Sequence, residues 1–161
     1  MPVVARIGML WLLLWAWVVL PGAPAQAVPL TTKYYSLALP ADWVVVNGPA
    51  EVKGAVQVLL GQKDHKSSVL LLVGPARPGE AQQAAEANAR RLGGGKPVQR
   101  GGQWEFFFEQ KGVRGCGIAR EDKASGLLLM LLVSGDLKRA DFVYAMRGPY
   151  KALIPNPPQR P

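Results

Sequence analysis

The sequence predicts an α+β protein with one globular domain, and three observations support this class. Several short apolar runs have the length of strands and lie between Gly, Pro and polar turn residues. Two other segments have the composition or spacing of helices. The chain has 161 residues, is 49% hydrophobic and carries a formal charge of +8, so it is long enough for one core without disulfides.

The first 27 residues have the pattern of a secretory signal peptide. Arg6 supplies a positive charge, Ile7–Leu20 is apolar and uncharged, and Ala25–Ala27 offers small residues for cleavage. As a helix the apolar run spans about 21 Å, less than the roughly 30 Å of a hydrocarbon layer. We therefore expect a mature chain that begins at Val28 and keeps no permanent membrane span. It would be periplasmic in a Gram-negative bacterium and secreted otherwise.

The first half of the mature chain is predicted to form strands. The apolar stretches that we interpret as strands are Tyr34–Leu39, Trp43–Val46, Ala55–Gly61 and Val69–Val73. Asn47–Pro49 is interpreted as a turn, and the polar residues 62–68 as a loop. Because Val69–Val73 contains no polar residue, we expect both of its faces to be covered.

Two helices are predicted. Glu80–Leu92 is rich in Ala, Gln, Glu and Arg, has no internal Gly or Pro, and is followed by the glycines at 93–95. Its small apolar face lets it approach a sheet closely but buries little area per residue. A second helix is expected from Leu137 to about Arg147, with Asp136 as its N-cap.

The segment Gln103–Arg120 is predicted to be a hairpin that turns at Lys111–Gly112. A two-residue loop pairs the aromatic residues of the first strand with small residues of the second. The predicted pairs are Trp104 with Ala119, Phe106 with Gly117, and Phe108 with Gly115. Large rings would then lie over small residues, as close packing requires.

The opposite face of this hairpin mixes charged, apolar and thiol side chains, which indicates partial cover or an edge position. We take it as the candidate interaction surface, formed by Glu105, Phe107, Glu109, Arg114, Cys116 and Arg120. Glu105 and Glu109 would be about 13 Å apart on one strand, farther than paired glycosidase carboxylates usually stand.

The remaining apolar run, Leu127–Val133, is our candidate for the centre of the sheet. The domain is expected to cover residues 28–153. Residues 154–161 are rich in proline, and we expect this tail to be disordered.

The order of these elements over residues 34–153, together with the motif Leu39-Pro40-Ala41-Asp42-Trp43, resembles the PsbP-like family, which includes PsbP, Mog and DcrB. The resemblance implies an α/β/α sandwich around a largely antiparallel sheet of about six or seven strands with two main helices. It also implies a binding or assembly role without a shared catalytic centre, and it transfers no functional residue.

Few residues in the chain suggest chemistry. Cys116 is the only cysteine and His65 the only histidine, so we predict no catalytic residue, no metal site and no cofactor. The glycines at 93–95 and the lysine that follows them superficially resemble a phosphate-binding loop. Because these glycines follow a helix and lead into Pro97, we interpret them as a helix stop.

The basic residues are dispersed along the chain, which is typical of a soluble protein, and export argues against a nucleic-acid partner. We expect an exported, non-enzymatic, monomeric protein that binds another protein or an anionic envelope component. The alternatives are a small-ligand carrier, a thiol-dependent enzyme that uses Cys116, and a structural subunit that folds fully only in an assembly.

Overall fold

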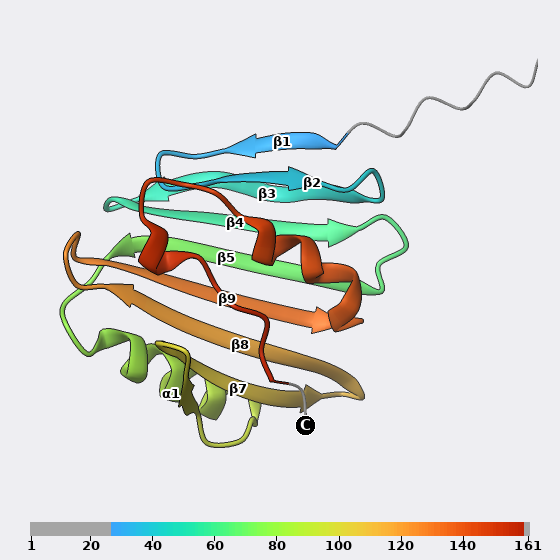
Figure 1. The fold of residues 1–161 in the computed structure, drawn as a ribbon. Helices are drawn as coiled ribbons and strands as arrows, with labels where there is room; N and C mark the ends of the chain where they lie inside the picture. The colour runs from blue at the N-terminus through green and yellow to red at the C-terminus, as the bar shows by residue number, and fades with distance from the viewer. Residues whose placement is uncertain (1–26, 160–161) are drawn as a thin grey trace, which may run out of the picture.

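The computed structural model describes residues 27–159 (Figure 1). The predicted signal peptide lies outside the described residues except for Ala27. Two sheets are formed by the strands β1 (Val28–Thr31), β2 (Ser36–Leu39), β3 (Trp43–Val52), β4 (Ala55–Gln62), β5 (Ser67–Pro75), β6 (Val98–Arg100), β7 (Gln103–Gln110), β8 (Val113–Asp122) and β9 (Leu127–Gly135). The helices are α1 (Glu80–Leu92) and the 3₁₀ segments η1 (Leu137–Ala145) and η2 (Lys151–Leu153). The protein is therefore α+β, as predicted.

The main sheet has seven antiparallel strands in the order β3-β4-β5-β9-β8-β7-β6. The central strand is β9, which confirms the prediction for Leu127–Val133. The register of the β7–β8 hairpin is also as predicted, since Phe106 pairs with Gly117 and Phe108 with Gly115. Lys111 and Gly112 at its turn have φ values of 52° and 76°, as a two-residue loop with two positive φ angles requires.

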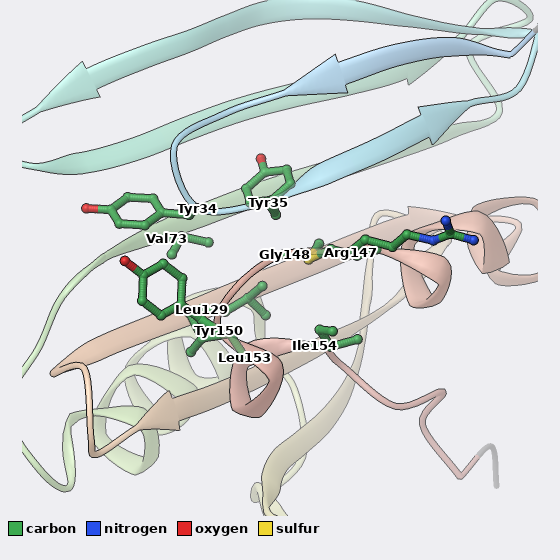
Figure 2. A pocket seen from close by; sticks show the side chains of 10 residues that line it. Tyr34, Tyr35, Val73, Leu129, Arg147, Gly148, Tyr150, Leu153 and Ile154 are labelled. Carbon is green, nitrogen blue, oxygen red and sulfur yellow. The ribbon is translucent and has the colours of Figure 1, made fainter.

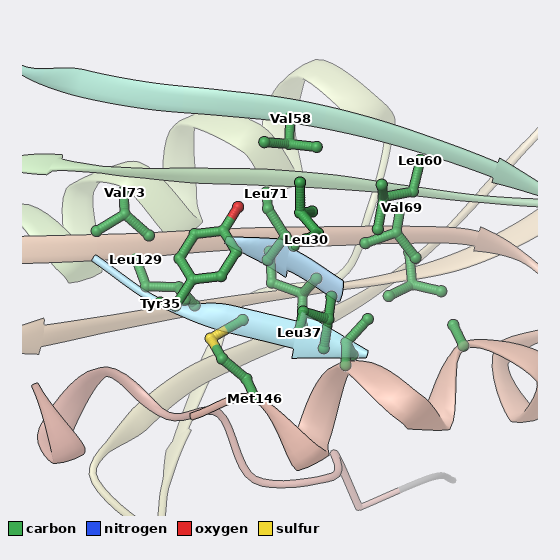
Figure 3. Packing of buried hydrophobic residues seen from close by; sticks show 14 of the residues in the cluster. Leu30, Tyr35, Leu37, Val58, Leu60, Val69, Leu71, Val73, Leu129 and Met146 are labelled. Atoms are coloured by element: carbon green, nitrogen blue, oxygen red, sulfur yellow. The ribbon is translucent and has the colours of Figure 1, made fainter. Parts of the chain in front are cut away.

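One face of the sheet is covered by the β1–β2 hairpin, η1 and η2. It is named here the hairpin face, after the β1–β2 hairpin. The residues that meet there come from the odd-numbered positions of β9 and their neighbours on β4, β5 and β8. Figure 3 shows Tyr35, Leu37 and Met146 directed at these strands. Because Val58, Leu60, Val69, Leu71 and Leu131 have no exposed surface, this is the main core.

The other face, named here the helix face, is covered by α1 over β7, β8 and β9. Ala81, Ala85 and Ala89 are the buried residues of the helix, and they lie against Phe106, Phe108 and the even-numbered residues of β9. The helix ends at Gly93, which adopts φ 66° and whose backbone N–H donates to the last turn. Both limits of the helix are those predicted.

The helix face is not covered along its whole width. Val44, Val46 and Val52 of the edge strand β3 are exposed, at 41%, 60% and 66% of their surface. Leu59 of β4 and Leu70 of β5 are half-buried beside them. Leu70 and Leu72 do pack against the helix cluster, so the cover over β5 is partial on this face. The prediction of two covered faces thus holds fully only on the hairpin face.

The second predicted helix is a 3₁₀ helix rather than an α-helix. Its buried residues Ala140 and Val143, and Met146 just after it, stand three positions apart, and Leu137 precedes them by the same step. A 3₁₀ helix has three residues per turn, so this spacing places all four on one side. Asp136 is the N-cap, as predicted, and its side chain accepts a hydrogen bond from the backbone N–H of Lys138.

Asn47–Pro49 is not a turn between strands. The segment lies inside β3, whose pairing with β4 shifts register on both sides of Asn47. An edge strand tolerates a proline and a bulge because one side of its backbone has no partner strand. The turn lies further on, at Lys53 and Gly54, which have φ values of 51° and 82°. The strand at Val28–Thr31 was not predicted, and the strand expected from Tyr34 begins at Ser36.

No helix within residues 27–159 is long and apolar enough to cross a membrane.

Tyr35 provides a test of this core through its pH dependence. Its hydroxyl is buried and has no hydrogen-bond partner within the described part of the chain, and burial raises its pKa above the ordinary value of 10.0. The unfolded chain therefore loses this proton at a lower pH than the folded one, so stability is retained below about pH 10 and falls above it. We expect Tyr35→Phe to make the unfolding free energy fall less steeply between pH 10 and 11. Urea titrations across that range measure the difference, and identical slopes would contradict the burial of the hydroxyl.

Candidate functional site

The predicted interaction surface lies on the hairpin face of β7 and β8, next to the sheet edge formed by β6. The structure divides it into two parts. The covered part contains Glu105, Cys116 and Arg120. The open part, near the turn of the β7–β8 hairpin, contains the exposed residues Glu109 and Arg114. Phe107 stands between the two parts and is half-buried against the main core.

The covered part lies under the C-terminal segment, which crosses from η2 toward β7 (Figure 1). Arg120 donates from Nε to the carbonyl of Ala152 at 2.8 Å, and burial lowers the pKa of its guanidinium. Gln103 exchanges two hydrogen bonds of 2.9 Å with the backbone of Asn156. Glu105, only 5% exposed, accepts from the backbone N–H of Gln159 at 3.3 Å. Residues 154–159 therefore pack on the sheet, where we expected a disordered tail.

The physical reason for this ordering is that side chains of the sheet satisfy the segment's backbone. Pro155 and Pro158 are buried, so the segment also removes apolar surface from water. Proline fixes φ and keeps the preceding residue extended, so less chain entropy is lost when the segment docks. Proline-rich composition therefore did not prevent packing here.

A depression of about 600 Å³ adjoins the open part and is lined by residues of both sheet faces; it is named here the hairpin groove, after the β7–β8 hairpin. It is lined by Gly93, Phe107, Phe108, Glu109, Arg114, Gly115 and Leu137. Phe107 and Leu137 supply apolar surface that remains partly exposed. Arg114 and Glu109 form an ion pair of 3.5 Å between Nε and Oε2. Both side chains are largely exposed, so this pair contributes little stability and leaves each charge available to a ligand.

Phe107 also lines a second depression, of about 510 Å³, on the side of β6. Lys96, Arg100 and Gln159 line it as well. The side chain of Phe107 is therefore reachable from two directions. Charged side chains of both signs flank it on both sides, Arg114 and Glu109 on one side and Lys96, Arg100 and Glu105 on the other.

A third cavity lies beneath the C-terminal segments and is shown in Figure 2. It has a volume of about 10 Å³ and is enclosed mainly by Tyr34, Tyr35, Tyr150 and Leu153. That volume is close to the smallest that holds one water molecule. The cavity is a packing feature of the core and is too small for an organic ligand.

The two residues considered for nucleophilic chemistry are placed differently. Cys116 is 1% exposed and belongs to the main core, whereas His65 is exposed in the loop between β4 and β5. A catalytic thiol needs access to its substrate, so the observed burial of Cys116 does not favour the thiol-enzyme alternative. Within residues 27–159, no three His, Cys, Asp or Glu side chains are grouped so that they could hold a metal ion.

The burial of Cys116 predicts slow alkylation. We expect iodoacetamide to modify Cys116 in the folded protein at least about a hundredfold more slowly than in urea, because the thiol becomes accessible only when the core opens. Mass spectrometry of quenched samples measures both rates. Similar rates in buffer and in urea would show that the thiol is exposed and would revive the enzyme alternative.

Sequence reasoning did not identify several residues of this region. Gln103 and Leu137 were assigned to a strand and a helix without a role in the surface, and Asn156 and Gln159 to a disordered tail. One signal was present: Gln103, Glu105 and Phe107 alternate with the core rings, so they share a face. The contribution of Leu137 depends on how η1 returns over the sheet, which local sequence does not specify.

Comparisons with known proteins give little further information. No protein-family model matches the chain, and no curated protein sequence matches it. The chain is similar to a solved structure from Bacteroides thetaiotaomicron VPI-5482, with a TM-score of 0.46 and 14% sequence identity. The alignment covers 76% of this chain and 48% of the other, so this chain spans about half the length of that structure. This similarity assigns neither a family nor a function.

Proposed function

We propose that the protein is an exported binding or assembly factor without catalytic activity, and that it contacts a partner through the hairpin groove. The observation that supports this proposal is the half-buried ring of Phe107, which borders two depressions and is flanked by basic and acidic side chains. An aromatic anchor within a polar and charged rim is a common arrangement at protein interfaces. Without Arg6 the proposed mature chain has 18 basic and 11 acidic residues, a formal charge of +7. This charge favours an acidic partner protein over a basic one, and an anionic envelope polymer is the second candidate.

We also propose that the fold is an α/β/α sandwich of the PsbP type. One helix over one sheet face, and 3₁₀ segments with a β-hairpin over the other, support this arrangement. The departures are the 3₁₀ form of η1 and the two-stranded hairpin that shares its layer. A crystal structure compared with PsbP-like proteins over residues 28–153 tests this assignment.

The experiment that tests the function is size-exclusion chromatography of the protein in a native extract of the exported fraction. We expect the wild-type chain to elute in a complex larger than its own monomer at low ionic strength, and Phe107→Ser to elute as the monomer. Gln82→Ser, at an exposed position of α1, is the matched control and should elute like the wild type. A wild-type protein that elutes as a monomer at low salt would contradict the proposal.

The exported location has its own test in the same material. N-terminal sequencing of the extracted protein is expected to begin at Val28. A chain that begins at Met1 in the cytosol would show that the protein is not exported, and the proposed class of partner would then be wrong.

A further inference from the structure

The C-terminal segment on the hairpin face is bound in an unusual way for a packed tail. Within residues 155–159 only Asn156 and Gln159 have a backbone N–H, because the other three are prolines. Both N–H groups donate to side chains of β7, Asn156 to Gln103 and Gln159 to Glu105. Every backbone donor of this stretch is therefore bound by a side chain of the sheet rather than by another strand.

The spacing of these two donors fits one backbone conformation. A polyproline II helix has three residues per turn, so N–H groups three positions apart point to the same side. Asn156 and Gln159 have this separation, and their acceptors Gln103 and Glu105 are two positions apart on β7 and so share a face. The side chains of Gln103 and Glu105 thus reach both donors of the proline-rich segment, at 2.9 and 3.3 Å.

The binding residues form a connected polar group within an otherwise apolar face. Gln103 donates to Glu105 at 2.8 Å as well as to the carbonyl of Asn156 at 2.9 Å, and Arg120 donates to Gln103 at 3.4 Å. Gln103 is 1% exposed and Glu105 5% exposed while the segment is in place. Buried polar groups require partners, and here the segment supplies several of them.

The described part of the segment, residues 154–159, ends beside a depression. Gln159 lines the depression of about 510 Å³ that also borders Phe107, Lys96 and Arg100. A partner chain that follows this path and continues past the position of Gln159 would therefore reach the ring of Phe107. The path over Gln103 and Glu105 and the surface around Phe107 are continuous.

We propose that Gln103, Glu105 and Arg120 form a recognition site for a proline-rich, extended segment of a partner protein, which this chain's own residues 154–159 occupy until the partner replaces them. This inference rests on the proposed function and specifies the chemistry of the partner. The partner segment carries backbone N–H groups three residues apart, with prolines between them and an acidic side chain beyond, toward Lys96 and Arg100. A tethered segment competes at millimolar effective concentration, so the free site is exposed only part of the time.

The test uses the full chain and a fluorescently labelled peptide with the sequence of residues 154–159. We expect the peptide to bind Asn156→Pro at least about fivefold more tightly than wild type, because the substitution removes the only N–H that Gln103 accepts from the tethered segment. Asn156→Ala keeps that N–H and is the matched control, expected to remain within about twofold of wild type. Fluorescence anisotropy measures all three affinities. Equal affinity for Asn156→Pro and wild type, or no binding to either, would overturn the proposal.

Amide hydrogen exchange of the unmodified protein tests displacement without any substitution. We expect the amides of Asn156 and Gln159 to exchange at least about a hundredfold faster than that of Leu131 in β9, since the segment must open locally for a partner to enter. Equal protection would show that the segment opens only with global unfolding and would overturn the proposal.

The two proposals fail in different ways. If the peptide does not bind but Phe107→Ser still dissociates the native complex, the proline-rich partner is wrong and the groove remains the contact. A full-length dimer that Asn156→Pro converts to a monomer would show exchange of this segment between two copies, and it would overturn the assignment to a different protein.

Discussion

Gly117→Ala is expected to lower the free energy of unfolding by about 1–3 kcal/mol, the usual effect of overpacking a close-packed layer. A Cβ built on Gly117 would overlap the far edge of the Phe106 ring, which lies across the glycine. Phe106 is 2% exposed and packed against α1, so the ring has little room to move. Urea denaturation followed by circular dichroism measures the loss.

A control and a compensating change make this prediction specific. A Cβ on Gly95 meets no atom within 4 Å, so Gly95→Ala is expected to change stability by no more than about 0.5 kcal/mol. Adding Phe106→Leu to Gly117→Ala should cost less than the two single changes together, because the smaller side chain makes room for the methyl group. Strict additivity would mean that ring and glycine are not in contact and that the register of the hairpin is wrong.

Leu131→Ala is expected to cost about 2–5 kcal/mol, the range for removing a leucine from a closed core. Leu131 has no exposed surface and lies on the central strand, on the face covered by the β1–β2 hairpin and η1. Neighbouring strands hold the backbone on both sides, so the cavity cannot collapse easily. The midpoint and slope of urea denaturation measure the change.

The matched control for Leu131→Ala is Leu59→Ala, at a half-buried position on the part of the helix face beyond α1. We expect Leu59→Ala to cost less than half as much, because less apolar surface is buried there. Equal losses at the two positions would show that the β3–β5 half of the helix face is covered in solution, in contrast to the structure.

Local sequence predicted the elements whose pattern has a single physical solution. The hairpin register followed from Lys111–Gly112 and from rings opposite glycines, and α1 followed from its composition and its terminal glycines. Leu127–Val133 is an uninterrupted apolar run of strand length, which predicted its place at the centre of the sheet.

The errors have common physical causes. The step of three in η1 is also compatible with one face of an α-helix, so periodicity alone did not distinguish the two helix types. Asn47–Pro49 has turn chemistry, but the free edge of β3 accommodates it as an irregularity. The structure brings the residues of the candidate surface to one face of β7 and β8, as the hairpin register predicted. Its division into two parts depends on the C-terminal segment, whose docking is decided by distant partners such as Gln103.

The central proposal is that the protein is exported and that it meets a partner at Phe107. The most direct measurement is site-specific photo-crosslinking in living cells, with a photoreactive phenylalanine analogue placed at position 107 or, as a control, at position 82 on α1. The account predicts one discrete adduct of higher mass from position 107 and none from position 82. No adduct from position 107, or the same adducts from both positions, would contradict it.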